Sequence, residues 1–145
     1  MTVDGSVTAN GAGFLGGTDL GDSGANGCTG LDEPSPTGAE KGESIAGLDF
    51  VSGDPPGGTG RGNRANGAGG GVCHNSGGGG GGHGGLGGLG GRTWRGDGDP
   101  VIPNTGRDIG GLGGAPLAYT ALAHLTMGGG GGAGQQNNDV GGAGS

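Results

Sequence analysis

Two aspartates separated by one glycine, Asp97 and Asp99, form the pattern in this sequence that most resembles a metal site. Carboxylate oxygens at alternate positions of a loop are typical ligands of calcium. The pattern departs from a standard calcium loop because Pro100 follows directly and no bidentate glutamate closes the loop. We therefore expect no cofactor, and keep calcium, with Asp97 and Asp99 as its candidate ligands, as the alternative.

The single tryptophan, Trp94, is the candidate for recognition of a carbohydrate. Its flanking arginines favour an exposed ring, and an exposed aromatic ring can stack on a sugar. A lone tryptophan in a loop more often packs beneath its own loop. The sequence leaves both interpretations open, with packing favoured.

The two cysteines, Cys28 and Cys73, predict one disulfide rather than a reactive thiol. A metal site or thiol dyad of Cys73 with His74 or His83 is disfavoured, because adjacent side chains of an extended chain point apart and a disulfide removes the thiolate. The bridge would close a loop of about 45 residues and stabilise the fold by about 4 kcal/mol in the chain-entropy model. A disulfide also favours an oxidising, extracellular location.

The candidate acids for catalysis are Glu40 and Glu43, since glycosidases need two carboxyl groups at a fixed separation. Nothing in the surrounding sequence fixes that separation. The chain has no phosphate-binding loop around Lys41 and no Gly-x-Ser-x-Gly elbow, and the Gly-x-Gly-x-x-Gly at Gly11 is expected by chance at this glycine content. We predict that the chain is not an enzyme.

The elements that must position these residues are dominated by glycine, which makes up 49 of 145 residues. From Gly81 the order becomes strict, with two glycines before each of His83, Leu86, Leu89 and Arg92. Three residues per turn is the repeat of the polyproline II conformation, which glycine readily adopts. We expect these four side chains to form one ridge, with two bare backbone faces beside it on which other segments can pack.

This pattern predicts an irregular or all-β fold of stacked, extended, polyproline II-like segments with short strands and long loop excursions. Collagen is excluded because the strict Gly-X-Y frame is absent and proline is scarce. We expect one domain over 1–145, belonging to a longer protein, with excursions at 31–60 and 92–108. A short strand is expected at 2–9, and at most one short helix near 116–124.

Charge and hydropathy exclude two classes of partner. The formal net charge is −7 and the arginines do not form Arg-Gly-Gly repeats, which argues against nucleic acid. No apolar run approaches the length of a membrane span, so we expect no membrane insertion. The partners that stay in view are a second copy of the chain and components of a cell surface or matrix.

Several phrases resemble a family of glycine-rich domains in large secreted or surface-exposed bacterial proteins. The matching pieces are spread over nearly the whole chain: Asn10 to Phe14, Lys41 to Glu43, Gly60 to Gly62, Asn66 to Asn75 and Leu125 to Asn138. The resemblance implies an extracellular or cell-surface location and no activity.

We therefore expect a non-catalytic structural or adhesive domain. A calcium- or glycan-binding surface module is the alternative. A third interpretation rests on a weaker likeness to glycine-rich antifreeze proteins built as polyproline II bundles, and would make the chain an ice-binding bundle.

Overall fold

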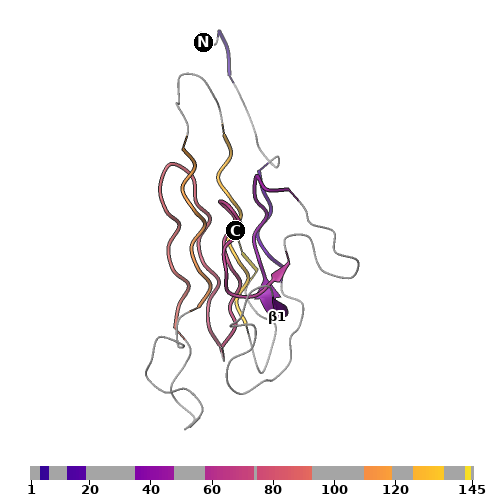
Figure 1. Cartoon of the computed structure of the whole chain (residues 1–145). Coiled ribbons are helices and arrows are strands. Elements are labelled where there is room, and N and C mark those ends of the chain that lie inside the picture. Colours follow the sequence, from indigo (N-terminus) through magenta and orange to yellow (C-terminus); the bar gives the residue numbers. More distant parts are fainter. Residues whose placement is uncertain are drawn as a thin grey trace.

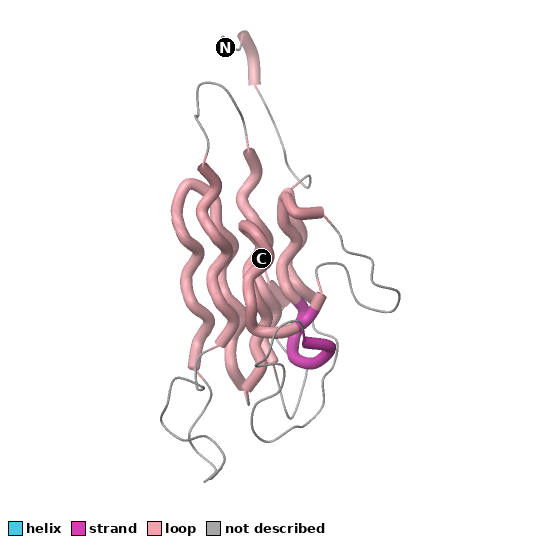
Figure 2. The backbone as a smooth tube through the Cα atoms, viewed as in Figure 1, coloured by secondary structure: helices cyan, strands magenta, loops and turns pink. Residues whose placement is uncertain are grey.

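The computed structural model describes several stretches of the chain, and the fold is presented from these alone. They are residues 4–6, 13–18, 35–47, 58–73, 75–92, 110–118, 126–135 and 143–144. Within them the backbone contains no helix and a single strand, β1 (Ser35–Glu40), and is otherwise irregular, drawn as the pink tube of Figure 2. Isolated bridges pair Glu40 with Thr59 and Arg64 with Gly67. The predicted irregular, non-helical class is correct for this part of the chain.

Two local expectations fall largely outside the described residues. Of the predicted strand at 2–9, only 4–6 are described, and they form no strand. Of the predicted helix near 116–124, only 116–118 are described, and they are not helical. The Leu117 N–H donates to His83 O at 2.7 Å and so joins this stretch to the segment 76–83.

Extended segments that are far apart in the sequence lie side by side and exchange backbone hydrogen bonds (Figure 1). Between a given pair of segments, the bonds recur at every third residue. Three N–H groups of the segment 126–135 donate to the segment 76–83 in this way: Gly129 to Gly82, Gly132 to Gly79 and Gln135 to Ser76, each at 2.9 Å. A β-ladder repeats every second residue, so this spacing explains why the bonds form no β-sheet.

The segment 66–73 lies at the centre of this arrangement. Every residue in it is buried, and its backbone bonds reach segments before and after it in the chain. These neighbours are residues 39–42, Gly60, 79–82, Leu112 and 130–133. The buried apolar side chains among the described residues are small ones, Ala39, Ala68, Val72, Cys73 and Ala133. Backbone packing therefore takes the place of a conventional side-chain core here.

The number of hydrogen-bonded amides falls from the centre to the edge. Every N–H from Gly67 to Cys73 has an acceptor. In the segment 110–117 the bonded donors skip one position in three, and Pro116, which has no N–H, occupies a skipped position. Within the described part of the chain, the backbone donors of the outer stretch 85–91 are Gly87 and Gly90. The segments that bond to more neighbouring segments therefore have more of their amides paired.

Glycine is required in the interior because neighbouring backbones leave no room for a side chain. A Cβ atom on Gly69 would lie under 3.0 Å from the carbonyl oxygen of Arg61, a distance that real Cβ atoms essentially never show. The same holds for Gly79 against Leu112 O and for Gly132 against Gly69 O. None of these glycines has a positive φ. Lack of a side chain, rather than conformational freedom, is what these positions use.

One part of the predicted excursion at 31–60 differs from expectation. Residues 39–43 are not a free loop, because Ala39 and Gly42 donate to Gly71 O and Ala68 O at 2.8 and 2.9 Å. A Cβ on Gly42 would overlap the backbone of Gly130, so this glycine allows the close approach. Apart from Arg92, the second predicted excursion, 92–108, lies outside the described residues.

Candidate interaction surface

The two glutamates considered as catalytic acids accept hydrogen bonds from the segment 13–18. Glu43 Oε2 accepts the Leu15 N–H at 2.9 Å, and Glu40 Oε2 accepts the Thr18 N–H and hydroxyl. Glu40 and Glu43 are three residues apart, and so are their partners Thr18 and Leu15. Glu40 is buried, and Glu43 is half-buried. These hydrogen bonds therefore join the segment 13–18 to residues 40–43.

His83 sits at the turn that connects the segments 76–83 and 85–92. Its Nε2 lies 2.9 Å from Thr126 O and 3.2 Å from Thr126 Oγ1. The ring therefore contacts the segment 126–135 across the turn. It does not complete the ridge predicted with the two leucines that follow it, since it is half-buried.

Cys73 is fully buried and disulfide-bonded, the state that the predicted Cys28–Cys73 bridge requires. Cys28 lies outside the described residues, so the pairing stays a prediction. Beside Cys73, the buried Ser76 hydroxyl accepts the N–H groups of Val72 and Cys73 at 3.0 and 2.9 Å. Ser76 N–H donates to Cys73 O at 2.8 Å and closes a turn in which Asn75 has a φ of 54°.

The remaining sequence candidates, Asp97, Asp99, Trp94 and His74, lie outside the described residues. Calcium and glycan binding therefore stay predictions. Among the residues that the structure does describe, no group of three or more His, Cys, Asp or Glu side chains could hold a metal ion.

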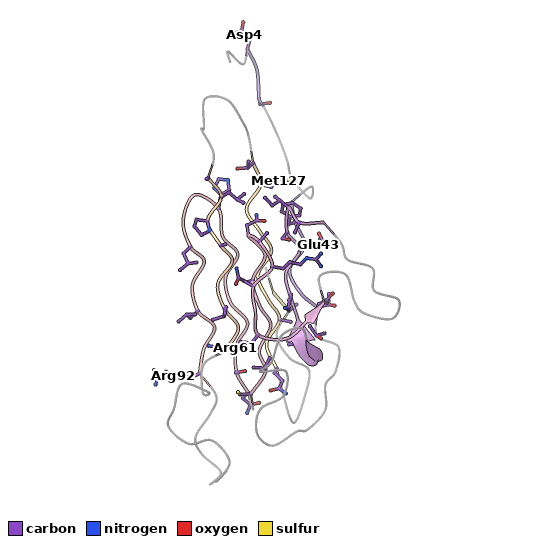
Figure 3. The ribbon with its side chains drawn as sticks, viewed as in Figure 1. Asp4, Glu43, Arg61, Arg92 and Met127 are labelled. Atoms are coloured by element: carbon purple, nitrogen blue, oxygen red, sulfur yellow. The ribbon has the colours of Figure 1, made fainter. Side chains whose placement is uncertain are left out.

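The outer segment 85–92, at the left edge of Figure 1, is the candidate interaction surface because it exposes apolar side chains. Leu86 and Leu89 are 73% and 63% exposed. They lie three residues apart, which is the spacing of the ridge that the sequence predicts. Arg92 ends the segment and is exposed (Figure 3). We call the face formed by residues 85–92 the glycine–leucine edge.

The repeat of three divides the residues of this edge into three sets of positions, which we call phases. Each phase has different surroundings. Gly87 and Gly90 face inward, and a Cβ on either would overlap backbone of Gly80 or Gly77. Leu86 and Leu89 occupy the second phase. The third phase consists of exposed glycines, Gly85, Gly88 and Gly91, and a Cβ on any of them would meet nothing within 4 Å.

The edge also has unused backbone hydrogen-bonding groups. Within the described part of the chain, no bond involves the N–H of Leu86, Gly88, Leu89 or Gly91. The carbonyl oxygens of Leu86, Gly87, Leu89 and Gly90 also accept none there. A row of unpaired donors and acceptors at the edge of an ordered array is a template for a further strand.

The repeat predicted that Leu86 and Leu89 lie on one ridge, but it did not predict the distinction between the two sets of glycines. The repeat Gly-Gly-Leu shows that two of three positions are bare. Which bare position packs inward depends on the neighbouring segments 76–83 and 110–117, and no local signal in the repeat specifies them.

Comparison with protein families, with curated proteins and with solved structures finds no match for this chain. In the described part of the chain there is also no helix long and apolar enough to cross a membrane.

Proposed function

We propose that the chain is a non-catalytic structural or adhesive domain of an extracellular, glycine-rich protein. Its architecture in this proposal is a stack of extended, polyproline II-like glycine segments held together by their backbones. The observation that carries the proposal is the three-residue repeat of the inter-segment hydrogen bonds, with glycines between them that have no room for a Cβ.

The use made of reactive side chains also supports a structural role. Glu40, Glu43 and His83 all bond to backbone groups of neighbouring segments, and Cys73 is consumed in a disulfide. These are among the groups that catalysis or metal binding would use in the described residues. The side chains left for contact with other surfaces include Leu86 and Leu89.

Adhesion is tested by retention of the purified chain on methyl-terminated and hydroxyl-terminated surfaces, followed with a quartz crystal microbalance. The double variant Leu86→Ser, Leu89→Ser should be retained on the methyl surface about a hundredfold more weakly or less, since burial of each leucine contributes about 1.5–3 kcal/mol and every 1.4 kcal/mol changes affinity about tenfold. Leu15→Ser is the matched control, because Leu15 is equally exposed, at 66%, on another segment. Retention that falls equally in both variants contradicts the proposal.

The alternative function, a calcium- or glycan-binding module, is tested on the same protein. Calcium titration calorimetry should show no tight binding. Tight binding that disappears in the double variant Asp97→Asn, Asp99→Asn would replace the structural role with a binding one. Inhibition of ice recrystallisation by the wild-type chain would instead favour the ice-binding bundle, and turnover of a polysaccharide or peptide lost in Glu40→Gln would establish an enzyme.

A further inference from the structure

We infer that the glycine–leucine edge pairs with the same edge of a second copy of this chain, as an antiparallel, twofold-symmetric dimer. The inference rests on the proposed function and names a partner for it. It starts from an anomaly in the glycines of residues 85–92.

Glycine at Gly85, Gly88 and Gly91 has no explanation within one molecule. None of the three has the positive φ that favours glycine, and a Cβ on each would be in open space. Interior glycines such as Gly79 and Gly111, in contrast, each face a backbone that excludes a Cβ. A face kept bare and unfilled fits the close approach of an external backbone, the role that bare faces have elsewhere in this fold.

The edge also continues the hydrogen-bonding pattern already used on its inner side. The inner face of 85–92 pairs antiparallel with 76–83, through Gly77 to Gly91 and Gly80 to Gly88 at 3.0 and 2.9 Å. The unused N–H groups of Gly88 and Gly91 recur at the same spacing. An extended antiparallel glycine segment can therefore pair with the outer side through hydrogen bonds at the same three-residue spacing.

A second copy supplies such a segment, and its symmetry fits. A twofold axis across the edge makes the two copies of 85–92 antiparallel and presents the same Gly-Gly-Leu repeat on both sides. Residues 75–92 contain no aspartate or glutamate, so this edge avoids the repulsion expected between chains of net charge −7. Because the contact uses up both edges, the assembly ends at a dimer.

The size of the contact predicts weak association. Eight residues at about 3.1 Å each span about 25 Å, which makes a contact at the small end of specific interfaces. The leucine phase lies about 120° from the glycine phase, so Leu86 and Leu89 flank the contact without filling it.

Sedimentation velocity of the whole chain, from about 10 µM to 1 mM, tests the inference. We expect a monomer–dimer equilibrium. Gly88→Ala should weaken it about tenfold or more, because its methyl group would enter the partner's path while meeting nothing within its own chain. Gly13→Ala is the matched control, since Gly13 is also exposed, lacks a positive φ and has nothing within 4 Å of a Cβ.

A monomer at every concentration overturns the inference, as does a dimer unaffected by Gly88→Ala, one weakened equally by Gly13→Ala, or open-ended assembly. Surface retention of the same samples separates this outcome from the proposed function. A monomeric chain that still adheres through Leu86 and Leu89 would refute the dimer alone. An intact dimer whose adhesion does not depend on the two leucines would refute adhesion alone.

Discussion

At the scale of single residues, Asn66 joins several segments through its side chain and its carbonyl group. It is fully buried, its Oδ1 accepts the Ile45 N–H at 2.9 Å, and its Nδ2 donates to Met127 O at 3.3 Å. Its own carbonyl accepts the Gly82 N–H at 2.8 Å. One asparagine therefore satisfies groups from three other parts of the chain.

Asn66→Asp should destabilise the fold by about 3 kcal/mol, because it removes the donor to Met127 O and buries a charge there. Urea unfolding measures the loss. Asn75→Asp is the control: Asn75 is exposed, and aspartate tolerates its φ of 54°. Equal stability of the two variants would contradict the role of Asn66.

Ala65 is a non-glycine residue whose backbone conformation suits glycine better. It has a φ of 46° in the turn that Arg64 and Gly67 close with mutual bonds of 2.9 and 2.8 Å. Ala65→Gly should stabilise the fold by about 1 kcal/mol, because an L-residue is strained in this region. Ala68→Gly, at a buried position without positive φ, should instead cost about 1 kcal/mol. Thermal unfolding of both variants checks the sign, and a loss in both would refute the strain at Ala65.

At the scale of the elements, we expect two classes of glycine: those packed against a neighbouring backbone and those in open space. Gly69→Ala should cost about 3 kcal/mol or more, because its Cβ would overlap Arg61 O and backbone atoms would have to shift. Gly88→Ala should be neutral or stabilising by up to about 1 kcal/mol, because it restricts only the unfolded chain. Urea unfolding at a concentration that keeps the chain monomeric compares them. Similar losses in both variants would mean that glycine acts through flexibility instead.

The elements also show how far sequence reasoning reaches. The three-residue repeat predicted that Leu86 and Leu89 share one ridge and that this stretch is extended, because period and glycine content are local properties, whereas His83 of the same predicted ridge is half-buried. The pairing of Glu40 and Glu43 with the segment 13–18 was not predictable. Their acidic, proline-containing surroundings are typical of a solvated loop, and their partners lie more than twenty residues away.

At the scale of the whole molecule, one covalent bond is expected to supplement the backbone packing. Cys28 and Cys73 should be joined when the chain is expressed in an oxidising compartment, and reduction should lower the free energy of unfolding by about 4 kcal/mol. Mass spectrometry of non-reduced peptides identifies the pair. Two free thiols after such expression would contradict it.

We propose that backbone hydrogen bonds between extended segments, repeating every third residue, hold this molecule together. Amide hydrogen exchange of the monomeric chain, followed by NMR, tests it most directly. Every amide from Gly67 to Cys73 should be protected. In the outer segment, Gly87 and Gly90 should be protected while Leu86, Gly88, Leu89 and Gly91 exchange freely. Protection at every second residue, or uniformly fast exchange in both segments, would contradict the claim.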